Sequence, residues 1–203
     1  MINRQKERTL KLVQVAMLAA IELLLSFTPL GYLHAGVIEI TFLTIPVAIA
    51  ATTVGPGASA VISLIFGISS FIQCFGMSPF GAALLGINGF LTFLVCVPTR
   101  ILMGWLTGLI YKGLRKTKLP SGASVTISNL CCPLLNTTFF MGMLVIGFYN
   151  TEYIQSFVSA LGAKNALLFI LAFVGVNGLV EAIVCFVVGT AISAALKKAL
   201  KYN

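Results

Sequence analysis

Long apolar runs, separated by glycine, proline and charged residues, set the pattern of this sequence. Four of the runs are each about 20 residues or more, the length that a helix needs to cross roughly 30 Å of hydrocarbon. They cover residues 9–30, 90–110, 125–148 and 166–196. The sequence therefore predicts four membrane-spanning helices.

Two shorter apolar segments lie between the first and second of these runs. They cover residues 40–54 and 58–75, and the turn Gly55-Pro56-Gly57 separates them, because proline and glycine interrupt a helical pattern. The first segment is short for a span, but counting both gives six helices. We therefore expect an all-α polytopic membrane protein in which residues 1–203 form a single six-helix transmembrane domain.

The basic residues are distributed unevenly around these six helices. Both termini and the loops after helices two and four share one side of the membrane, and eleven of the thirteen basic residues lie there. These are Arg4, Lys6, Arg8, Lys11, Lys112, Arg115, Lys116, Lys118, Lys197, Lys198 and Lys201. Because loops rich in lysine and arginine tend to stay in the cytoplasm, we predict that both termini are cytoplasmic.

The composition agrees with an integral membrane protein. Hydrophobic residues make up 59% of the 203 residues and charged residues 9%, and the mean hydropathy is +1.05, which lies outside the range of soluble domains. Basic residues beside the cytoplasmic leaflet explain the net charge of +8 without a nucleic-acid partner. The five cysteines form no C-x-x-C pair and His34 is the single histidine, so no metal site or cofactor is expected.

Several catalytic patterns are missing from the sequence. It contains no aspartate, no G-x-x-x-x-G-K-[ST] phosphate loop and no G-x-S-x-G nucleophile motif. An enzyme is therefore not expected. A channel, a transporter, a substrate-binding membrane subunit and a membrane scaffold remain as classes.

Arg100 and Glu181 are the clearest ionisable residues inside the predicted spans. Arg100 follows Asn88 by twelve residues and Glu181 follows Ala166 by fifteen, which places both near mid-membrane at about 1.5 Å per residue. Such residues are costly in a bilayer and mark either a functional site or a structural pair. Both readings stay open for Arg100 and Glu181. For Glu22, a place in the cavity and a contact with a partner helix both stay open.

Other polar residues lie at similar depth. Asn136, Thr137 and Thr138 follow Pro133 in helix five, and Asn177 shares a helix face with Glu181 in helix six. Together they predict a cavity that faces the outer leaflet, although the asparagines would serve equally as contacts between helices.

Two outer segments have the composition of a mobile lid or of ordinary loops. Residues 30–42 and 75–89 combine glycines with Tyr32, His34, Phe80 and Asn88. In helix one, Ala16 and Ala20 form a small-xxx-small surface that allows close approach of another helix.

This ordered set of features resembles the substrate-binding S-components of energy-coupling factor transporters for vitamins. The resemblance covers the whole chain. It rests on about 200 residues in six helices, a basic amino terminus, and four stretches: AMLAA, ITFLTIPVAIAATTVGPGASAVISLIFGISSF, SPF and NTTFFMG.

The resemblance implies a division of labour within a multi-pass complex of a bacterial cell membrane. The S-component captures a vitamin from outside and topples within the bilayer to deliver it. A transmembrane coupling subunit and two cytoplasmic ATPase subunits supply the motion, and Ala16 and Ala20 match the family's docking surface for the coupling subunit.

The resemblance also suggests a substrate. The pattern is most similar to the pantothenate S-components, and the single Trp105 disfavours thiamin. Arg100 would bind the vitamin carboxylate with two parallel hydrogen bonds. The other expected contacts are Asn136, Glu181, Asn88, Asn177, Thr137 and Tyr32. Pyridoxine, hydroxymethylpyrimidine and riboflavin are alternative ligands, and a structural subunit without a ligand or a proton-coupled transporter acting alone are alternative functions.

Overall fold

A computed structural model describes residues 4–34 and 39–199, and it is built mainly of helices. In chain order the elements are α1 (Arg4–Ser26), η1 (Pro29–Gly31), β1 (Tyr32–His34), β2 (Glu39–Thr41), α2 (Thr44–Thr53), α3 (Pro56–Gln73), α4 (Pro79–Ile87), α5 (Gly89–Leu114), α6 (Ser121–Phe148), α7 (Glu152–Ala160), α8 (Ala166–Val184), η2 (Cys185–Gly189) and α9 (Thr190–Ala199). The two strands form a small antiparallel hairpin in which Tyr32 pairs with Thr41. The predicted all-α membrane fold is confirmed.

Five helical segments in the described part of the chain are long and apolar enough to cross a membrane. They are Gln5–Ser26, Pro56–Gln73, Gly89–Leu114, Ser121–Phe148 and Gly178–Ala199. The remaining segment of the six, residues 40–54, yields the ten-residue helix α2, which is only about 15 Å long. The count of six spans therefore stays a prediction, because α2 reaches about half-way across the hydrocarbon.

Helix α2 is enclosed by the other helices. Eight of its ten residues are buried, as expected for a helix that is apolar on every side. The Thr52 hydroxyl donates to Ser193 of α9 at 3.0 Å, whereas the Thr44 carbonyl accepts from the Cys132 thiol in the middle of α6 at 3.6 Å. The first turn of α2 thus lies deep inside the bundle and its last turn lies nearer one end.

The last predicted helix, residues 166–196, is interrupted. It consists of α8, the π-helical turn η2 and α9, and Gly175 within α8 has non-helical dihedral angles of φ 27° and ψ −114°. A residue with a side chain adopts a positive φ of this kind only with strain. The outer segment 75–89 also differs from a plain loop, because it contains α4.

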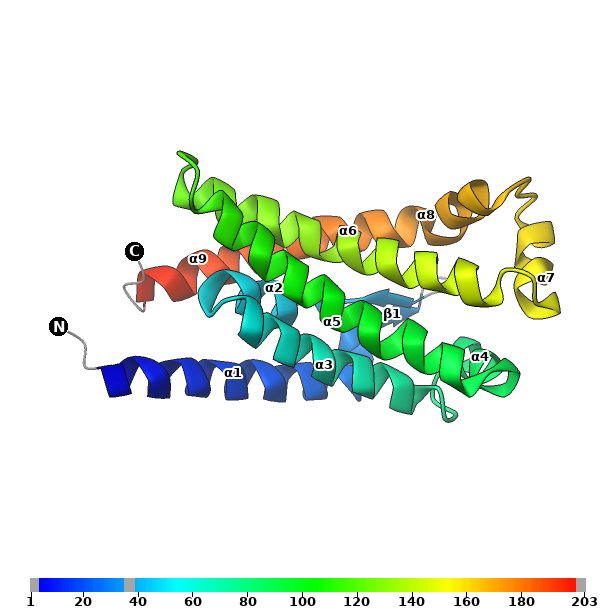
Figure 1. Cartoon of the computed structure of the whole chain (residues 1–203), viewed down its shortest axis with the longest axis horizontal. Helices are drawn as coiled ribbons and strands as arrows, with labels where there is room; N and C mark the ends of the chain where they lie inside the picture. Colours follow the sequence, from blue (N-terminus) through cyan, green and yellow to red (C-terminus); the bar gives the residue numbers. More distant parts are fainter. Residues whose placement is uncertain (1–3, 35–38, 200–203) are drawn as a thin grey trace.

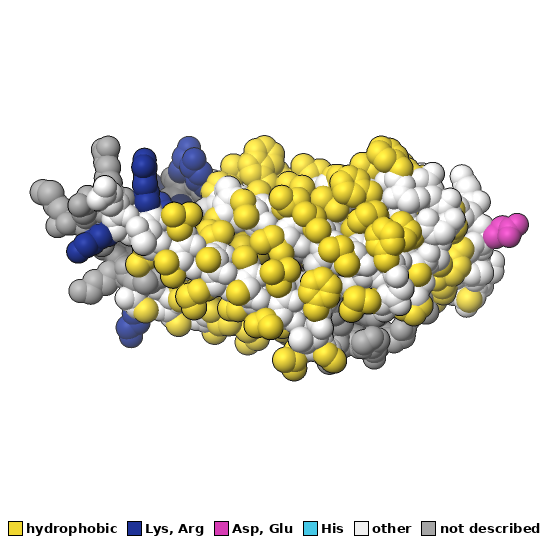
Figure 2. Space-filling view, turned by 90° about the horizontal axis from the view of Figure 1, so that it is seen from below, with side chains coloured by type: hydrophobic (Ala, Val, Ile, Leu, Met, Phe, Trp, Pro, Cys, Tyr) yellow, Lys and Arg dark blue, Asp and Glu magenta, His cyan; other side chains and the backbone are white. Residues whose placement is uncertain are grey.

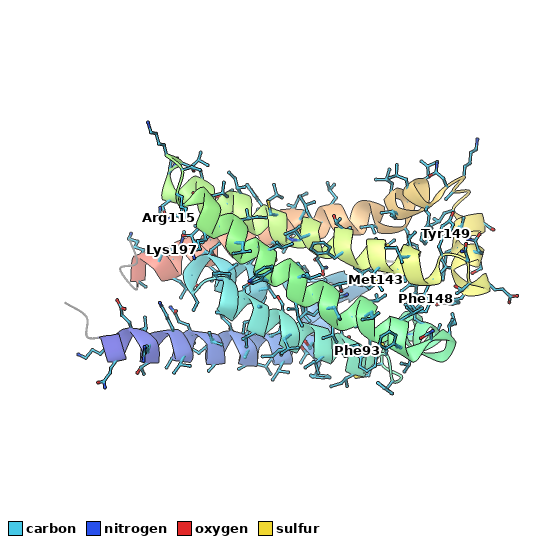
Figure 3. All side chains as sticks on the ribbon, in the orientation of Figure 1. Phe93, Arg115, Met143, Phe148, Tyr149 and Lys197 are labelled. Carbon is cyan, nitrogen blue, oxygen red and sulfur yellow. The ribbon has the colours of Figure 1, made fainter. Side chains whose placement is uncertain are left out.

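The elongated bundle has two chemically different ends (Figure 1). The first turn of α1 and the last turn of α9 lie at one end, and the short helices α4 and α7 lie at the other. Figure 2 shows basic side chains gathered at the first end and hydrophobic side chains along the length of the visible face. In Figure 3, Arg115 and Lys197 mark the basic end, and Phe148 and Tyr149 lie near the opposite end.

Helices α3 and α5 pack closely because glycines line their contact. A Cβ atom at Gly108 would lie 2.3 Å from the Pro56 Cα atom, and one at Gly104 would lie 2.8 Å from the Ser59 carbonyl oxygen. Backbone atoms cannot move aside as a flexible side chain can. This close contact holds α3 beside the part of α5 that carries Arg100.

Replacing Gly108 with alanine should therefore destabilise the protein. The added methyl group meets backbone, and overpacking of this kind costs about 1 to 3 kcal/mol. The matched control is Gly113→Ala on the same helix, where a Cβ has open space within 4 Å and alanine favours the helix. Thermal unfolding in detergent should show a lower melting temperature for Gly108→Ala than for Gly113→Ala. Equal melting temperatures would contradict the close helix contact.

Candidate functional site

Arg100 is buried near the middle of α5 and is held by its own helix. Its side chain is 7% exposed. One guanidinium nitrogen, Nη1, donates to the Val95 carbonyl at 2.8 Å and to the Thr99 hydroxyl at 3.4 Å. The Nε nitrogen is buried and has no hydrogen-bond partner. The guanidinium therefore keeps donor capacity for a further group.

Aromatic rings enclose the guanidinium of Arg100. Its central carbon lies 4.6 Å from the centre of the Phe140 ring of α6 and 5.1 Å from that of Phe66 of α3. These cation–π contacts stabilise the charge without neutralising it. Among the described residues, no carboxylate oxygen lies within 4.0 Å of the guanidinium nitrogens. Arg100 is thus a buried cation whose counter-charge is not a direct protein contact.

Glu181 of α8 contacts α6, the helix that also carries Phe140. Asn136 of α6 donates from Nδ2 to Glu181 Oε1 of α8 at 3.4 Å, and both residues are 7% exposed. Asn136 and Phe140 are four residues apart and share a helix face. Arg100 and Glu181 therefore border one face of α6, with Asn136 and Phe140 between them, and they do not form a direct ion pair.

Several further polar side chains have buried atoms without a hydrogen-bond partner among the described residues, namely Gln14, Glu22, Thr44, Ser63 and Asn129. Glu22 of α1 is fully buried, and both of its carboxylate oxygens lack a hydrogen bond. Thr44, the first residue of α2, is also fully buried, and its hydroxyl lacks a partner. Buried polar groups in folded proteins are nearly always satisfied. Orphaned groups such as these are what a bound polar ligand would satisfy.

The sequence pointed to only one of the two residues Glu22 and Thr44. Glu22 stood out as an ionisable residue in a predicted span, but its place, in the cavity or against a partner helix, stayed open because the local pattern does not show which way the side chain faces. Thr44 was not singled out. Pro46 could have pointed to it, because proline within a helix is tolerated in the first turn and so indicates that a helix begins near Thr44. A helix that begins near Thr44 and ends before Gly55 places its N-terminus deep in the membrane.

Two of the remaining predicted site residues, Asn88 and Thr137, have side chains that the structure describes. Asn88 is exposed at the start of α5, where its side-chain oxygen accepts from the Leu91 amide at 3.1 Å and caps the helix. Thr137 is half-buried on the side of α6 that faces Gly178 of α8. The side chains of Tyr32 and Asn177 lie outside the described part of the structure. Arg100, Asn136 and Glu181 are therefore the predicted residues that meet around α6.

Both outer segments pack against the bundle. The hairpin β1–β2 leads directly into α2, and β2 lies against α8. Phe80 of α4 contacts an aromatic cluster, with its ring centre 5.9 Å from that of Tyr153 in α7 and 5.8 Å from that of Phe173 in α8. Residues of 75–89 thus close one end of the bundle through aromatic contacts.

The surface of α1 provides a second candidate region. Ala16 and Ala20 are both exposed on this helix, so the small-xxx-small surface is free within the described chain. Beside it lies an apolar groove of about 510 Å³ lined by residues of α1, α2 and α9, among them Leu18, Ile49 and Ile192. One long face of α1 is therefore open to lipid or to another helix.

Comparison with protein families identifies the class. The family model of the ECF transporter substrate-specific component matches residues 10–193. The chain therefore belongs to the substrate-specific components of ECF transporters, which bind a small-molecule substrate in a membrane complex with coupling and ATPase subunits and are not themselves enzymes. A search of curated proteins gives no significant match.

Replacing Glu22 with methionine should stabilise the ligand-free protein. The variant removes a buried carboxyl group that has no partner, which relieves a desolvation cost of about 1 to 3 kcal/mol. The control on the same face of α1 is Ser26→Ala, because Ser26 is paired with the Ser69 hydroxyl at 2.8 Å and its loss should destabilise. Melting temperatures in detergent test both. A lower melting temperature for Glu22→Met would show that Glu22 has a stabilising partner within the protein.

Proposed function

We propose that this chain is the pantothenate-binding S-component of an ECF transporter. The observation that carries the proposal is Arg100, a buried guanidinium between two aromatic rings with a free Nε donor and no carboxylate in direct contact. A small carboxylate suits such a site, because a guanidinium binds it with two parallel hydrogen bonds. The counter-charge then arrives with the substrate.

The other groups of the site suit the rest of the vitamin. Pantothenate has an amide and two hydroxyl groups besides its carboxylate. Glu181 accepts from a hydroxyl or the amide N–H, and Asn136 bonds the amide. Glu22 and the Thr44 hydroxyl, which have no partner among the described residues, provide the remaining acceptors and donors. The aromatic rings of Phe66 and Phe140 supply apolar contact.

The two buried carboxyl groups favour a second class of ligand as the alternative. Glu22 and Glu181 are both hydrogen-bond acceptors when ionised, and pyridoxine and hydroxymethylpyrimidine carry hydroxyl or amino donors without a carboxylate. Riboflavin is the next alternative ligand after these two. These ligands would leave Arg100 without an anionic partner, which is why pantothenate is preferred.

Transport requires movement that the partners supply. The vitamin enters from the end that carries α4 and α7, and residues 30–42 and 75–89 close over it. A transmembrane coupling subunit docks on the Ala16 and Ala20 surface, and two cytoplasmic ATPases drive the reorientation. The chain spans a bacterial cell membrane with its basic end in the cytoplasm, and the hairpin together with α2 completes the second of six crossings.

Vitamin binding to the purified chain tests the proposal. Pantothenate should bind, and Arg100→Ala should weaken that binding by more than roughly tenfold, because a charge-assisted hydrogen bond contributes about 1.5 to 3 kcal/mol. Calorimetry with pantothenate, pyridoxine, hydroxymethylpyrimidine and riboflavin measures this directly. Failure of all four vitamins to bind would refute the proposal. An unchanged pantothenate affinity in Arg100→Ala with a lower melting temperature would assign Arg100 to packing.

The docking surface on α1 makes a separate prediction. The double variant Ala16→Trp, Ala20→Trp should abolish vitamin uptake by the complete transporter and leave vitamin binding by the isolated chain intact, since both alanines are exposed. The control is Ile146→Trp, a substitution at an α6 residue that is 81% exposed. Uptake in cells and binding to the purified chain are compared. Loss of binding in the double variant would show that this face of α1 packs within the chain.

A further inference from the structure

Two cysteine side chains meet between α3 and α5. The Sγ atoms of Cys74 and Cys96 are 3.9 Å apart, and the residues are 4% and 5% exposed. The Ser70 hydroxyl contacts the Cys96 sulfur at 3.9 Å, and the Cys74 thiol contacts the Ser70 carbonyl at 3.3 Å. The two sulfurs are therefore held facing one another by a common neighbour.

The thiol pair lies between the candidate site and α4. Cys96 precedes Arg100 by one turn of α5. On the other side, a Cβ atom at Gly81 of α4 would lie 2.6 Å from the Cys74 sulfur, so α4 packs directly on this thiol. The segment from Cys74 to Cys96 contains all of α4, and a bond between the sulfurs would enclose that helix in a covalent loop.

We propose that Cys74 and Cys96 are a site of reversible oxidation, at which a disulfide restrains α4. The sulfurs must approach by roughly 2 Å, because a disulfide bond is about 2.05 Å long. The pair lies toward the end of the bundle opposite the basic residues, which is the side facing an oxidising exterior in the proposed orientation.

The oxidation balances with a peroxide as the oxidant. One thiolate attacks the peroxide oxygen and becomes a sulfenic acid, with release of hydroxide or water. The second thiol then attacks that sulfur, forms the S–S bond and displaces water. Two thiols lose two electrons and two protons, and hydrogen peroxide becomes two molecules of water. A thiol reductant reverses the reaction by exchange.

The other three cysteines provide an internal comparison. Cys132 and Cys185 both direct their thiols to the Thr44 carbonyl, at 3.6 and 3.9 Å, and Cys131 is half-buried. Within the described residues, Cys74 and Cys96 are the cysteines whose sulfur atoms contact one another. Oxidation should therefore be selective among the five cysteines of the chain.

Mass spectrometry of the full chain in detergent tests the site. The protein is treated with hydrogen peroxide or with diamide, a diazene that takes up the same two electrons and two protons, and is then denatured and alkylated. We expect two of the five cysteines to escape alkylation, a peptide linking residues 74 and 96, and full alkylation after dithiothreitol. A variant that keeps only these two cysteines should behave alike, and Cys74→Ser should form no link. Alkylation of all five cysteines, or a link to a different cysteine, would overturn the proposal.

Hydrogen–deuterium exchange tests the restraint on α4 without any ligand. Backbone amides of residues 80–87 should exchange at least severalfold more slowly in the oxidised protein, because a cross-link limits the open states of the loop that it closes. Amides of α9 lie outside the loop and at the opposite end of the bundle, and they serve as the control (Figure 1). Unchanged exchange in α4 would refute the restraint. Both measurements are independent of vitamin binding, so their failure is distinguishable from failure of the proposed function.

Discussion

The cost of burying a polar group where no water can reach it is the constraint on which this structure depends. Backbone groups avoid this cost by pairing with one another in helices, and basic side chains avoid it by lying at one end of the bundle (Figure 2). Most hydroxyl groups in the interior avoid it by donating to a carbonyl one turn earlier, as Thr107 does with Met103 at 2.8 Å. Buried polar groups without a hydrogen-bond partner therefore mark where the protein needs another molecule.

Three of those exceptions belong to the candidate site or its surroundings. Among the described residues, the Nε of Arg100, the carboxylate of Glu22 and the hydroxyl of Thr44 are buried without partners, and the short helix α2 brings Thr44 deep into the bundle. A helix that crossed the whole membrane would place its first residue at the surface. The half-length helix and the hairpin before it thus create an interior lined by polar groups, which a substrate-binding subunit needs and a structural subunit does not.

The sequence predicted the long helices well, because span length and the basic residues at one end follow directly from bilayer physics. It also placed Arg100, Asn136 and Glu181 at a common depth. The break at Gly175 and the π-helical turn were not foreseen, since apolar runs conceal a local change of helix geometry. Glu22 and Thr44 escaped because tertiary packing, and not local pattern, decides whether a polar side chain finds a partner. The capping role of Asn88 likewise depends on where α5 begins.

Native mass spectrometry of the chain released from cell membranes observes the occupant of the site without a choice of ligand, and it therefore tests whether a substrate completes the buried polar groups. We expect one bound molecule per chain with the mass of pantothenate, and we expect its loss when the variant Arg100→Ala is released in the same way. A chain that carries no small molecule after growth with abundant vitamins would contradict the claim that a substrate completes these buried groups.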